Sequence, residues 1–233
     1  MRLLLAAVAL LALSTRALAA PPLLYVALGD STAVGVGAAQ GGGYPERIAR
    51  RLGASGTEVK LVNLGVSGAT AEDVRREQLP RALEEHPALV TIGVGLNDVL
   101  RGRPLAEFAR DLEVIADGVS RTRAAVVVSE LPDVARSPSG AGSPPSLARR
   151  IAAYNATVRR VAERHGFEVV ELEEPSRRAF GERADLFAAD GLHPSARGYE
   201  LWADLAWPPV ERALALAPHV QARRPGPPAA PQR

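Results

Sequence analysis

The sequence predicts an α/β protein built on a parallel β-sheet with helices on both faces. Short segments rich in apolar and β-branched residues alternate with segments of helical periodicity, the pattern of repeated β-α units. The first short segment is apolar at nearly every position from Leu23 to Leu28, as expected for a strand covered on both faces. No internal repeat favours another architecture. The chain is therefore expected to form a three-layer α/β/α domain.

The five predicted strands share a short apolar core and end at glycine or polar residues. Gly29 ends the first strand, and the third is rich in β-branched residues. We expect these strands at residues 23–28, 58–63, 88–94, 124–129 and 167–172.

The predicted helices are expected at residues 46–52, 70–79, 105–120, 147–165 and 195–216. Thr70 and Asp73 have the spacing of a near capping box at the start of the second helix, and Pro80 is expected to end it. The loop Pro132–Ser146 is rich in Pro, Gly and Ser, so we expect it to be mobile. Because it follows the fourth strand, it is expected to form one wall of an acyl pocket; the alternative is a surface connection with no role in the site.

The N-terminus has the three parts of a secretory signal peptide: the basic residue Arg2, an apolar run at 3–13, and small residues ending in Ala17-Leu18-Ala19. The apolar run is shorter than the ~20 residues that span a bilayer, so a retained anchor is the weaker alternative and no stable membrane span is expected. We therefore expect residues 1–20 to be a signal peptide, residues 21–217 to form one domain, and the protein to be exported to the periplasm or the medium.

Composition excludes several classes of site and partner. The chain contains no cysteine, which rules out disulfides, thiolate metal sites and a lipid-modified cysteine. Without Arg2 and Arg16 of the leader, 26 basic residues balance 26 acidic ones, so no nucleic-acid footprint is visible. Residues 218–233 are rich in proline and are expected to be a disordered tail.

A candidate nucleophile, Ser31, follows the first strand in Gly29-Asp30-Ser31. A serine at the carboxyl end of such a strand has its hydroxyl in the crevice where open α/β sheets bind ligands. The alternative is that Asp30, Ser31 and Thr32 only cap the next helix.

A nucleophilic serine needs a histidine to take its proton, and a carboxylate usually orients that histidine. Among the four histidines, His86, His165 and His219 lie in positions typical of structural or surface residues. His193 differs, because Asp190 precedes it by three residues in a short turn between the last strand and the last helix. The alternative is a turn-capping aspartate beside a surface histidine.

Acyl transfer also needs hydrogen-bond donors for the oxyanion of the tetrahedral intermediate. Two segments at strand ends offer them. The glycine-rich segment 63–70 follows the second strand, and Gly95-Leu96-Asn97-Asp98 follows the third. Each segment alone is equally typical of a simple turn.

Four short motifs, taken together and in this order, resemble the four blocks of the SGNH (GDSL-type) hydrolases. They are Gly29-Asp30-Ser31, Gly68, Gly95-x-Asn97-Asp98 and Asp190-x-x-His193. The resemblance implies that Ser31 is the nucleophile, that Asp190 and His193 are its acid and base, and that the N–H groups of Ser31 and Gly68 and the side chain of Asn97 form the oxyanion hole. Gly65 is a rival for Gly68, but the Ser67-Gly68-Ala69-Thr70 context favours Gly68.

The resemblance also implies a fold and an activity. The family has a flavodoxin-like, five-stranded parallel sheet of order 2-1-3-4-5. The chain is most similar to the secreted thioesterase, arylesterase and lysophospholipase subgroup, with which it shares the segment 97–102. We therefore expect an exported serine esterase that acts on short-to-medium acyl esters or thioesters through an acyl-enzyme. A small-molecule substrate, no cofactor, no metal and a monomer are expected.

Three alternatives compete with this interpretation. The same fold supports O-acetyl esterases of polysaccharides, although no carbohydrate-binding module is visible in the sequence. A non-catalytic binding protein on this fold would be expected to lack at least one of the motif residues. A metal hydrolase using Asp30, Asp190 and His193 is disfavoured, because one histidine with scattered carboxylates is not a typical zinc set.

Overall fold

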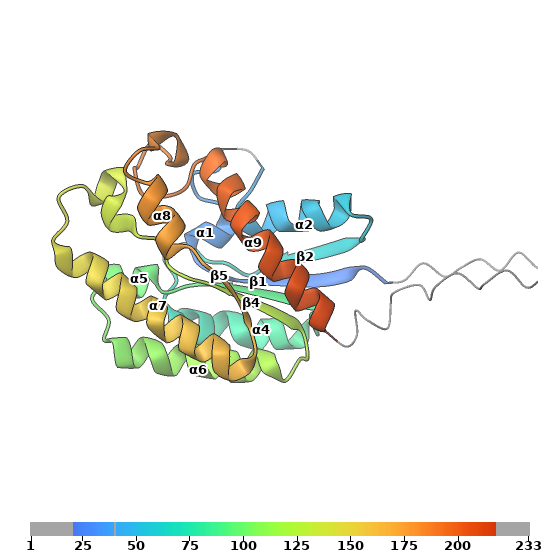
Figure 1. Cartoon of the computed structure of the whole chain (residues 1–233). Coiled ribbons are helices and arrows are strands. Elements are labelled where there is room, and N and C mark those ends of the chain that lie inside the picture. The colour runs from blue at the N-terminus through green and yellow to red at the C-terminus, as the bar shows by residue number, and fades with distance from the viewer. Residues whose placement is uncertain (1–20, 40, 218–233) are drawn as a thin grey trace, which may run out of the picture.

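The computed structural model describes residues 21–39 and 41–217, in which five parallel strands form one sheet of order β2-β1-β3-β4-β5 (Figure 1). The predicted fold class and strand order are confirmed. The predicted signal peptide and the predicted tail lie outside the described residues. The strands are β1 (Leu23–Gly29), β2 (Val59–Asn63), β3 (Leu89–Gly93), β4 (Ala125–Ser129) and β5 (Glu168–Val170).

The register of the central strands determines where the chain leaves the sheet. Gly29 of β1 lies beside Gly93 of β3, and Asn63 of β2 lies beside Ala27 of β1. The segments that follow β1, β2 and β3 therefore leave the sheet at nearly the same level, along its carboxyl edge. Ligands bind at this edge in open α/β sheets.

Helices cover both faces of the sheet (Figure 1). One face packs against α2 (Tyr44–Ala54) and α9 (Ala196–Leu216). The other face packs against α4 (Leu79–Glu84), α6 (Leu105–Ser120) and α7 (Pro145–His165).

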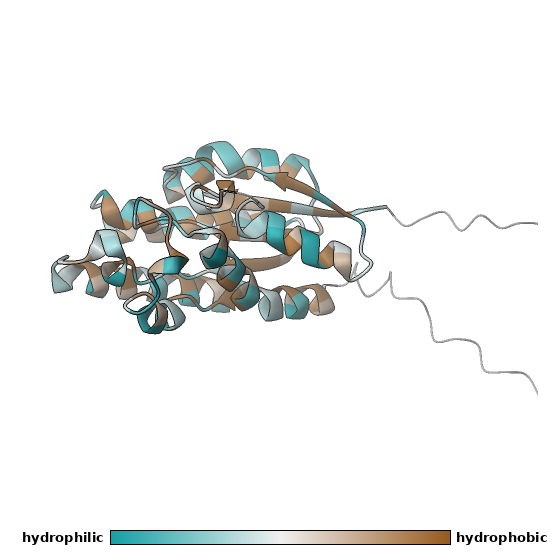
Figure 2. Cartoon of the chain, turned by 90° about the horizontal axis from the view of Figure 1, so that it is seen from above, coloured by the Kyte–Doolittle hydropathy of each residue, from teal (hydrophilic) through white to brown (hydrophobic). Residues whose placement is uncertain are grey.

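The pleat of β1 divides its side chains between the two cores: Tyr25 and Ala27 belong to one, whereas Val26 and Leu28 belong to the other. In Figure 2 the strands are mostly brown, while the helices carry both colours. This is the distribution expected of strands buried on both faces and of helices buried on one.

The helical segment after β2 differs from its prediction. Thr70 and Asp73 form the expected capping box at the start of α3 (Ala71–Asp73). The predicted end at Pro80 is wrong, because a π-helical turn at Val74–Gln78 leads directly into α4. In this wide turn the N–H of Leu79 bonds the carbonyl oxygen of Val74, five residues back. Pro80 is the second residue of α4, so the helical chain continues past it.

Several short elements at the carboxyl edge of the sheet were not predicted. The loop 132–146 contains two of them and gives way to α7 at Pro145, two residues earlier than expected. The helices are α1 (Ser31–Val34), α5 (Leu96–Leu100) and α8 (Glu173–Ala179), and the 3-10 turns are Val134–Arg136, Pro138–Gly140 and Ala184–Leu186. Within residues 21–39 and 41–217, no helix combines the length and apolarity needed to cross a membrane.

Candidate active site

Ser31 begins helix α1, directly after β1 and Gly29. Asp30 is the N-cap of this helix: its Oδ1 accepts hydrogen bonds from the N–H of Thr32 at 2.9 Å and from Oγ1 of Thr32 at 2.8 Å. The capping alternative is thus correct for Asp30, and it is compatible with a reactive serine. The cap fixes the backbone at the point where Ser31 leaves the sheet.

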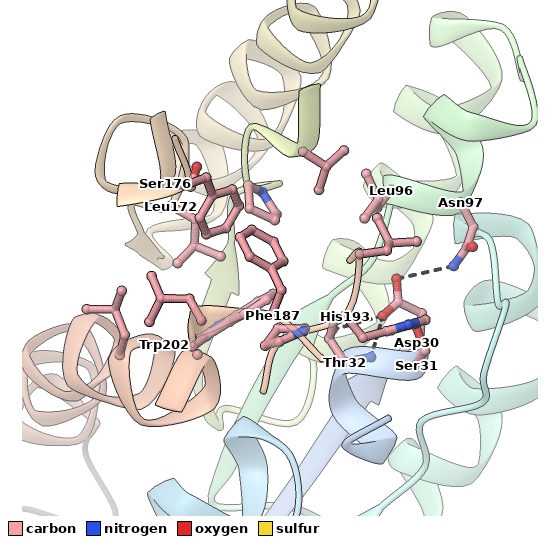
Figure 3. Close-up of a pocket in the computed structure, with 18 of the residues that line it drawn as sticks. Asp30, Ser31, Thr32, Leu96, Asn97, Leu172, Ser176, Phe187, His193 and Trp202 are labelled. Carbon is pink, nitrogen blue, oxygen red and sulfur yellow. Dashed lines mark hydrogen bonds between the residues drawn. The ribbon is translucent and has the colours of Figure 1, made fainter. Parts of the chain in front are cut away.

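The turn before α9 brings His193 to this serine. Nε2 of His193 lies 2.9 Å from Oγ of Ser31, and Nδ1 of His193 lies 2.5 Å from Oδ2 of Asp190 (Figure 3 shows His193 beside Ser31). The other oxygen of Asp190 accepts the N–H groups of Leu192 and His193 at 2.9 and 3.0 Å. One aspartate therefore shapes the turn and also holds the imidazole.

The direction of proton donation follows from the ionisation of Asp190. Although partial burial raises the pKa of Asp190, the hydrogen bonds from His193 and from the N–H of Leu192 outweigh it and lower that pKa to about 2. The ionised carboxylate can only accept, so the proton between Asp190 and His193 belongs to Nδ1. In the neutral form of the imidazole, Nε2 then has a free lone pair that can accept a hydrogen bond from the hydroxyl of Ser31.

A second contact ties this turn to the rest of the molecule. The N–H of Ser139, in the loop between β4 and α7, donates to the carbonyl oxygen of Gly191 at 3.1 Å. Gly191 has φ +68°, and a Cβ atom there would lie 3.0 Å from the backbone nitrogen of Ser139. Only glycine fits both the backbone conformation and the close approach.

The proposed oxyanion donors, Ser31, Gly68 and Asn97, lie on three neighbouring segments at the end of the sheet. Within the described part of the chain, the N–H groups of Ser31 and Gly68 have no hydrogen-bond acceptor. The N–H of the rival Gly65, in contrast, donates to Oδ1 of Asn63 at 3.0 Å. Gly68 therefore fits the role of donor better than Gly65 does.

Asn97 is held from two sides. Its Nδ2 donates to the carbonyl oxygen of Ala69 at 3.0 Å and to Oδ2 of Asp30 at 3.3 Å (Figure 3). Burial raises the pKa of Asp30, while its hydrogen bonds with Thr32 and the proximity of His193 oppose that rise. Asp30 thus connects the segment of Ser31 with the side chain of Asn97.

An apolar cavity of about 190 Å³ opens at these residues. Figure 3 shows Ser31, His193 and Asn97 at one end and Trp202, Leu172 and Ser176 at the other. The β4–α7 loop contributes Pro132 and Val134, which supports its expected role as a wall. The further apolar lining consists of Leu96, Leu100, Phe180, Leu186, Phe187, Leu192, Leu201 and Leu205.

The sequence analysis missed Gln78. This buried side chain reaches back from the π-helical turn to the last residue of β1: its Oε1 accepts the N–H of Gly29 and its Nε2 donates to the carbonyl oxygen of Gly29, both at 2.8 Å. This pair of hydrogen bonds, which we call the Gln78 clamp, holds the backbone two residues before Ser31. A glutamine at an inward position of an amphipathic helix is the signal that could have revealed it.

The three residues of the alternative metal site, Asp30, Asp190 and His193, do not form a ligand cluster. Asp190 faces Nδ1 of His193, whereas Asp30 bonds Thr32 and Asn97, so the three proposed ligands do not converge. Among the described residues, one group of three potential ligands has its atoms within 4.8 Å of one another: Glu113, Asp117 and His165. There His165, the last residue of α7, contacts Oε1 of Glu113 at 3.0 Å and Oγ of Ser120 at 3.1 Å, so it joins the end of α7 to α6, the structural role expected of it.

Comparison with known proteins identifies related chains over most of the sequence. A family model described as the GDSL-like lipase/acylhydrolase family matches residues 27–201. Esterase TesA of Pseudomonas aeruginosa is 30% identical over 208 residues, which cover 88% of this chain and 94% of that protein.

Solved structures of related esterases have a similar fold. The crystal structure of TesA matches with a TM-score of 0.67 at 27% identity, over 82% of this chain and 99% of that one. A variant of Axe2, an acetyl xylan esterase from Geobacillus stearothermophilus, matches with a TM-score of 0.69 over 80% of this chain and 94% of that one. At 20% identity, this second likeness concerns the fold alone.

Proposed function

Because the chain belongs to the GDSL-like lipase/acylhydrolase family and is a carboxylic ester hydrolase, we propose that it is an exported serine esterase for short-to-medium acyl esters or thioesters. The observation that carries this proposal is the chain of contacts from Asp190 through His193 to Ser31 at the mouth of an apolar cavity. In this proposal Ser31 is the nucleophile, His193 the general base and Asp190 the carboxylate that orients it.

In the first half of the reaction, Oγ of Ser31 attacks the carbonyl carbon of the substrate while Nε2 of His193 takes the hydroxyl proton. Asp190 stabilises the imidazolium that forms. The tetrahedral intermediate then collapses, and His193 returns the proton to the departing alcohol or thiol. The product of this half is an acyl ester on Ser31.

In the second half, water replaces the alcohol or thiol. Nε2 of His193 takes a proton from water, and the resulting hydroxide attacks the carbonyl carbon of the acyl-enzyme. Collapse of the second intermediate returns the proton to Oγ of Ser31 and releases the carboxylic acid. No cofactor enters this proposed sequence.

In both halves a negative charge develops on the carbonyl oxygen. We assign its stabilisation to the N–H groups of Ser31 and Gly68 and to Nδ2 of Asn97. A well-placed donor of this kind contributes roughly 3 to 4 kcal/mol to stabilising the transition state.

The cavity supports an acyl group longer than acetate. Its walls beyond Ser31 are mostly leucine, phenylalanine, proline, valine and tryptophan side chains, with Ser176 as a polar exception at the far end (Figure 3). They offer an alkyl chain apolar contacts and offer a sugar few hydrogen-bonding groups. This favours the acyl esterase over the alternative polysaccharide O-acetyl esterase.

Export rests on the N-terminal pattern of residues 1–20, which lie outside the described residues. Expression of the full chain in a bacterial host, followed by mass spectrometry of the periplasmic and extracellular protein, tests it. A mature N-terminus near residue 21 in an exported fraction is expected. Intact protein held in the cytoplasm would contradict export.

Substrate profiling tests the chemical assignment. We expect kcat/KM for nitrophenyl esters and acyl thioesters to rise from acetyl to medium-length acyl groups, with little activity on acetylated xylan. A preference for acetylated sugars would favour the alternative esterase. An absence of hydrolysis and of labelling by a serine-directed phosphonate would favour the non-catalytic binding protein.

A further inference from the structure

Three exposed aliphatic side chains lie on the segments that border the cavity. Val34, Val66 and Leu100 have exposed fractions of 45%, 48% and 48%. Each lies within three residues of a proposed oxyanion donor: Val34 follows Ser31, Val66 precedes Gly68, and Leu100 follows Asn97. We call these three residues the rim patch.

The three segments that carry the rim patch are in direct contact. A Cβ atom on Gly65 would lie 2.7 Å from the Cβ atom of Ala33, so the segment of Val66 packs against α1. On its other side, Nη2 of Arg101 donates to the carbonyl oxygen of Gly68 at 2.8 Å. The rim patch is therefore spread over three adjoining segments of one edge of the molecule.

The rim patch is continuous with the cavity. Leu100 is half exposed to solvent and also lines the cavity. Ser67 and Gly68, which follow Val66 in the chain, line the cavity as well. An alkyl chain that crosses Leu100 would move from the outer surface to the inner wall along apolar side chains. Isolated exposed aliphatic residues are common on proteins, but their location at the entrance of an apolar cavity is informative.

Two basic side chains flank the α5 end of the rim patch. Arg101 is exposed, and a Cβ atom on Gly102 would lie 3.9 Å from Nη1 and from Nη2 of Arg150. Within residues 21–39 and 41–217, neither Arg101 nor Arg150 has a carboxylate partner within 4.0 Å, although most other arginines near this edge do. Both donate instead to backbone carbonyl oxygens, Arg101 to that of Gly68 and Arg150 to that of Arg103, each at 2.8 Å, so within the described ranges neither positive charge is paired with a carboxylate at salt-bridge distance.

We propose that the rim patch, together with Arg101 and Arg150, docks the protein on the surface of an anionic lipid aggregate, so that acyl chains enter the cavity from the lipid. This combination of exposed aliphatic side chains and neighbouring arginines is how proteins bind lipid interfaces without spanning them. A second copy of the chain fits less well, because a symmetric contact would bring like charges together. The acyl-entry part rests on the proposed function, whereas the docking part does not.

The absence of cysteine from the chain permits a test that reports on position. Val34→Cys and Val66→Cys each introduce a single thiol for an environment-sensitive nitrobenzoxadiazole label at the rim patch. Val114→Cys is the matched control, because Val114 has an exposed fraction of 47% and lies away from the catalytic segments. Leu216→Cys is a second control at a more exposed position, 68%, at the end of α9. All four proteins share the same N-terminus, so residues 1–20 contribute equally.

On addition of vesicles of phosphatidylcholine with phosphatidylglycerol, we expect label emission at positions 34 and 66 to rise about threefold or more and to shift to the blue, as apolar surroundings replace water. The control positions should change little, pure phosphatidylcholine should give a weaker response, and added salt should weaken binding to the anionic vesicles. A response equal at all four positions, or none at 34 and 66, would overturn the proposal. A rise that depends on protein concentration without vesicles would overturn it in favour of self-association.

Activity on a water-soluble acetyl nitrophenyl ester separates this proposal from the proposed function. If the labelled proteins do not bind vesicles but hydrolyse the ester fully, the docking proposal is wrong and the proposed esterase function stands. If they bind vesicles but hydrolyse nothing, the docking proposal stands, and both the esterase function and the entry of acyl chains from the lipid are wrong.

Discussion

Nδ2 of Asn97 lies 3.3 Å from Oδ2 of Asp30 and 3.0 Å from the carbonyl oxygen of Ala69. A side-chain amide has two protons, so both have an acceptor before any substrate is bound. If Asn97 donates to an oxyanion as proposed, the oxyanion must share or take the Nδ2 proton that Asn97 donates to Asp30, since that is the longer of the two contacts. We infer that Asp30 keeps Asn97 aimed at the site and yields its hydrogen bond in the transition state.

If Asn97 is such a donor, Asn97→Ala should lower kcat by roughly 10²- to 10³-fold with a smaller change in KM, because the interaction is made mainly in the transition state. Steady-state kinetics on a nitrophenyl ester measures both constants. A rise in KM with kcat untouched would instead assign Asn97 to substrate binding.

Ser31→Ala should abolish esterase activity while leaving the fold intact, because the hydroxyl would be the attacking group and contributes little to packing. Circular dichroism and thermal unfolding provide the control for folding. Wild-type protein should be labelled once by a serine-directed phosphonate. Labelling that persists at another serine in the variant would remove Ser31 from the mechanism.

The acid limb of the pH–rate profile should arise from His193. The pKa of Asp190 is lowered from its ordinary value to about 2, so this carboxylate is ionised at all pH values above about 4. A loss of kcat/KM on acidification above that pH must then come from another group. His193 is the expected one, because a protonated Nε2 cannot accept the proton of Ser31.

His193→Ala should therefore remove nearly all activity together with this limb. Asp190→Asn should retain the limb at reduced kcat/KM, since the base remains but is less well oriented. Profiles of the wild type and both variants from pH 4 to 9 decide the matter. If His193→Ala keeps the acid limb, His193 is not the base. If Asp190→Asn has the kcat/KM of the wild type, Asp190 has no part in the mechanism.

Gln78→Leu should destabilise the protein by about 1–3 kcal/mol and lower kcat, because it leaves the buried N–H of Gly29 without its acceptor. Denaturant unfolding measures the first effect and steady-state kinetics the second. Glu77→Ala is the matched control, since Glu77 is an exposed neighbour on the same π-helical turn. Unchanged stability would show that the Gln78 clamp on β1 contributes nothing measurable.

Leu205→Phe should shift the acyl-length preference toward shorter chains, because Leu205 lines the cavity from α9 and a phenyl ring would shorten it. We expect kcat/KM for octanoyl esters to fall about tenfold relative to acetyl esters. Leu216→Phe, on an exposed position of the same helix, is the control. An identical acyl-length profile would mean that the acyl chain does not occupy this part of the cavity.

The sequence alone predicted the fold class, the five strands and the positions of the candidate site residues. The reason is local: apolar runs identify strands, and parallel strands bring their carboxyl ends to one edge. Ser31, Asn97 and Gly68 follow three different strands, so their meeting at one crevice could be expected once the sheet was parallel. Asp190 and His193 are three residues apart, and a single turn is enough to pair them.

Only the tertiary structure decided how these residues are supported and what surrounds them. Gln78 holds Gly29 across 49 positions of sequence, and the π-helical turn that carries Gln78 inward continues past Pro80. The contact between Ser139 and Gly191 joins two loops that have no sequence signal in common. Such contacts depend on which distant segments the folded sheet places side by side, whereas propensity and periodicity describe only neighbours along the chain.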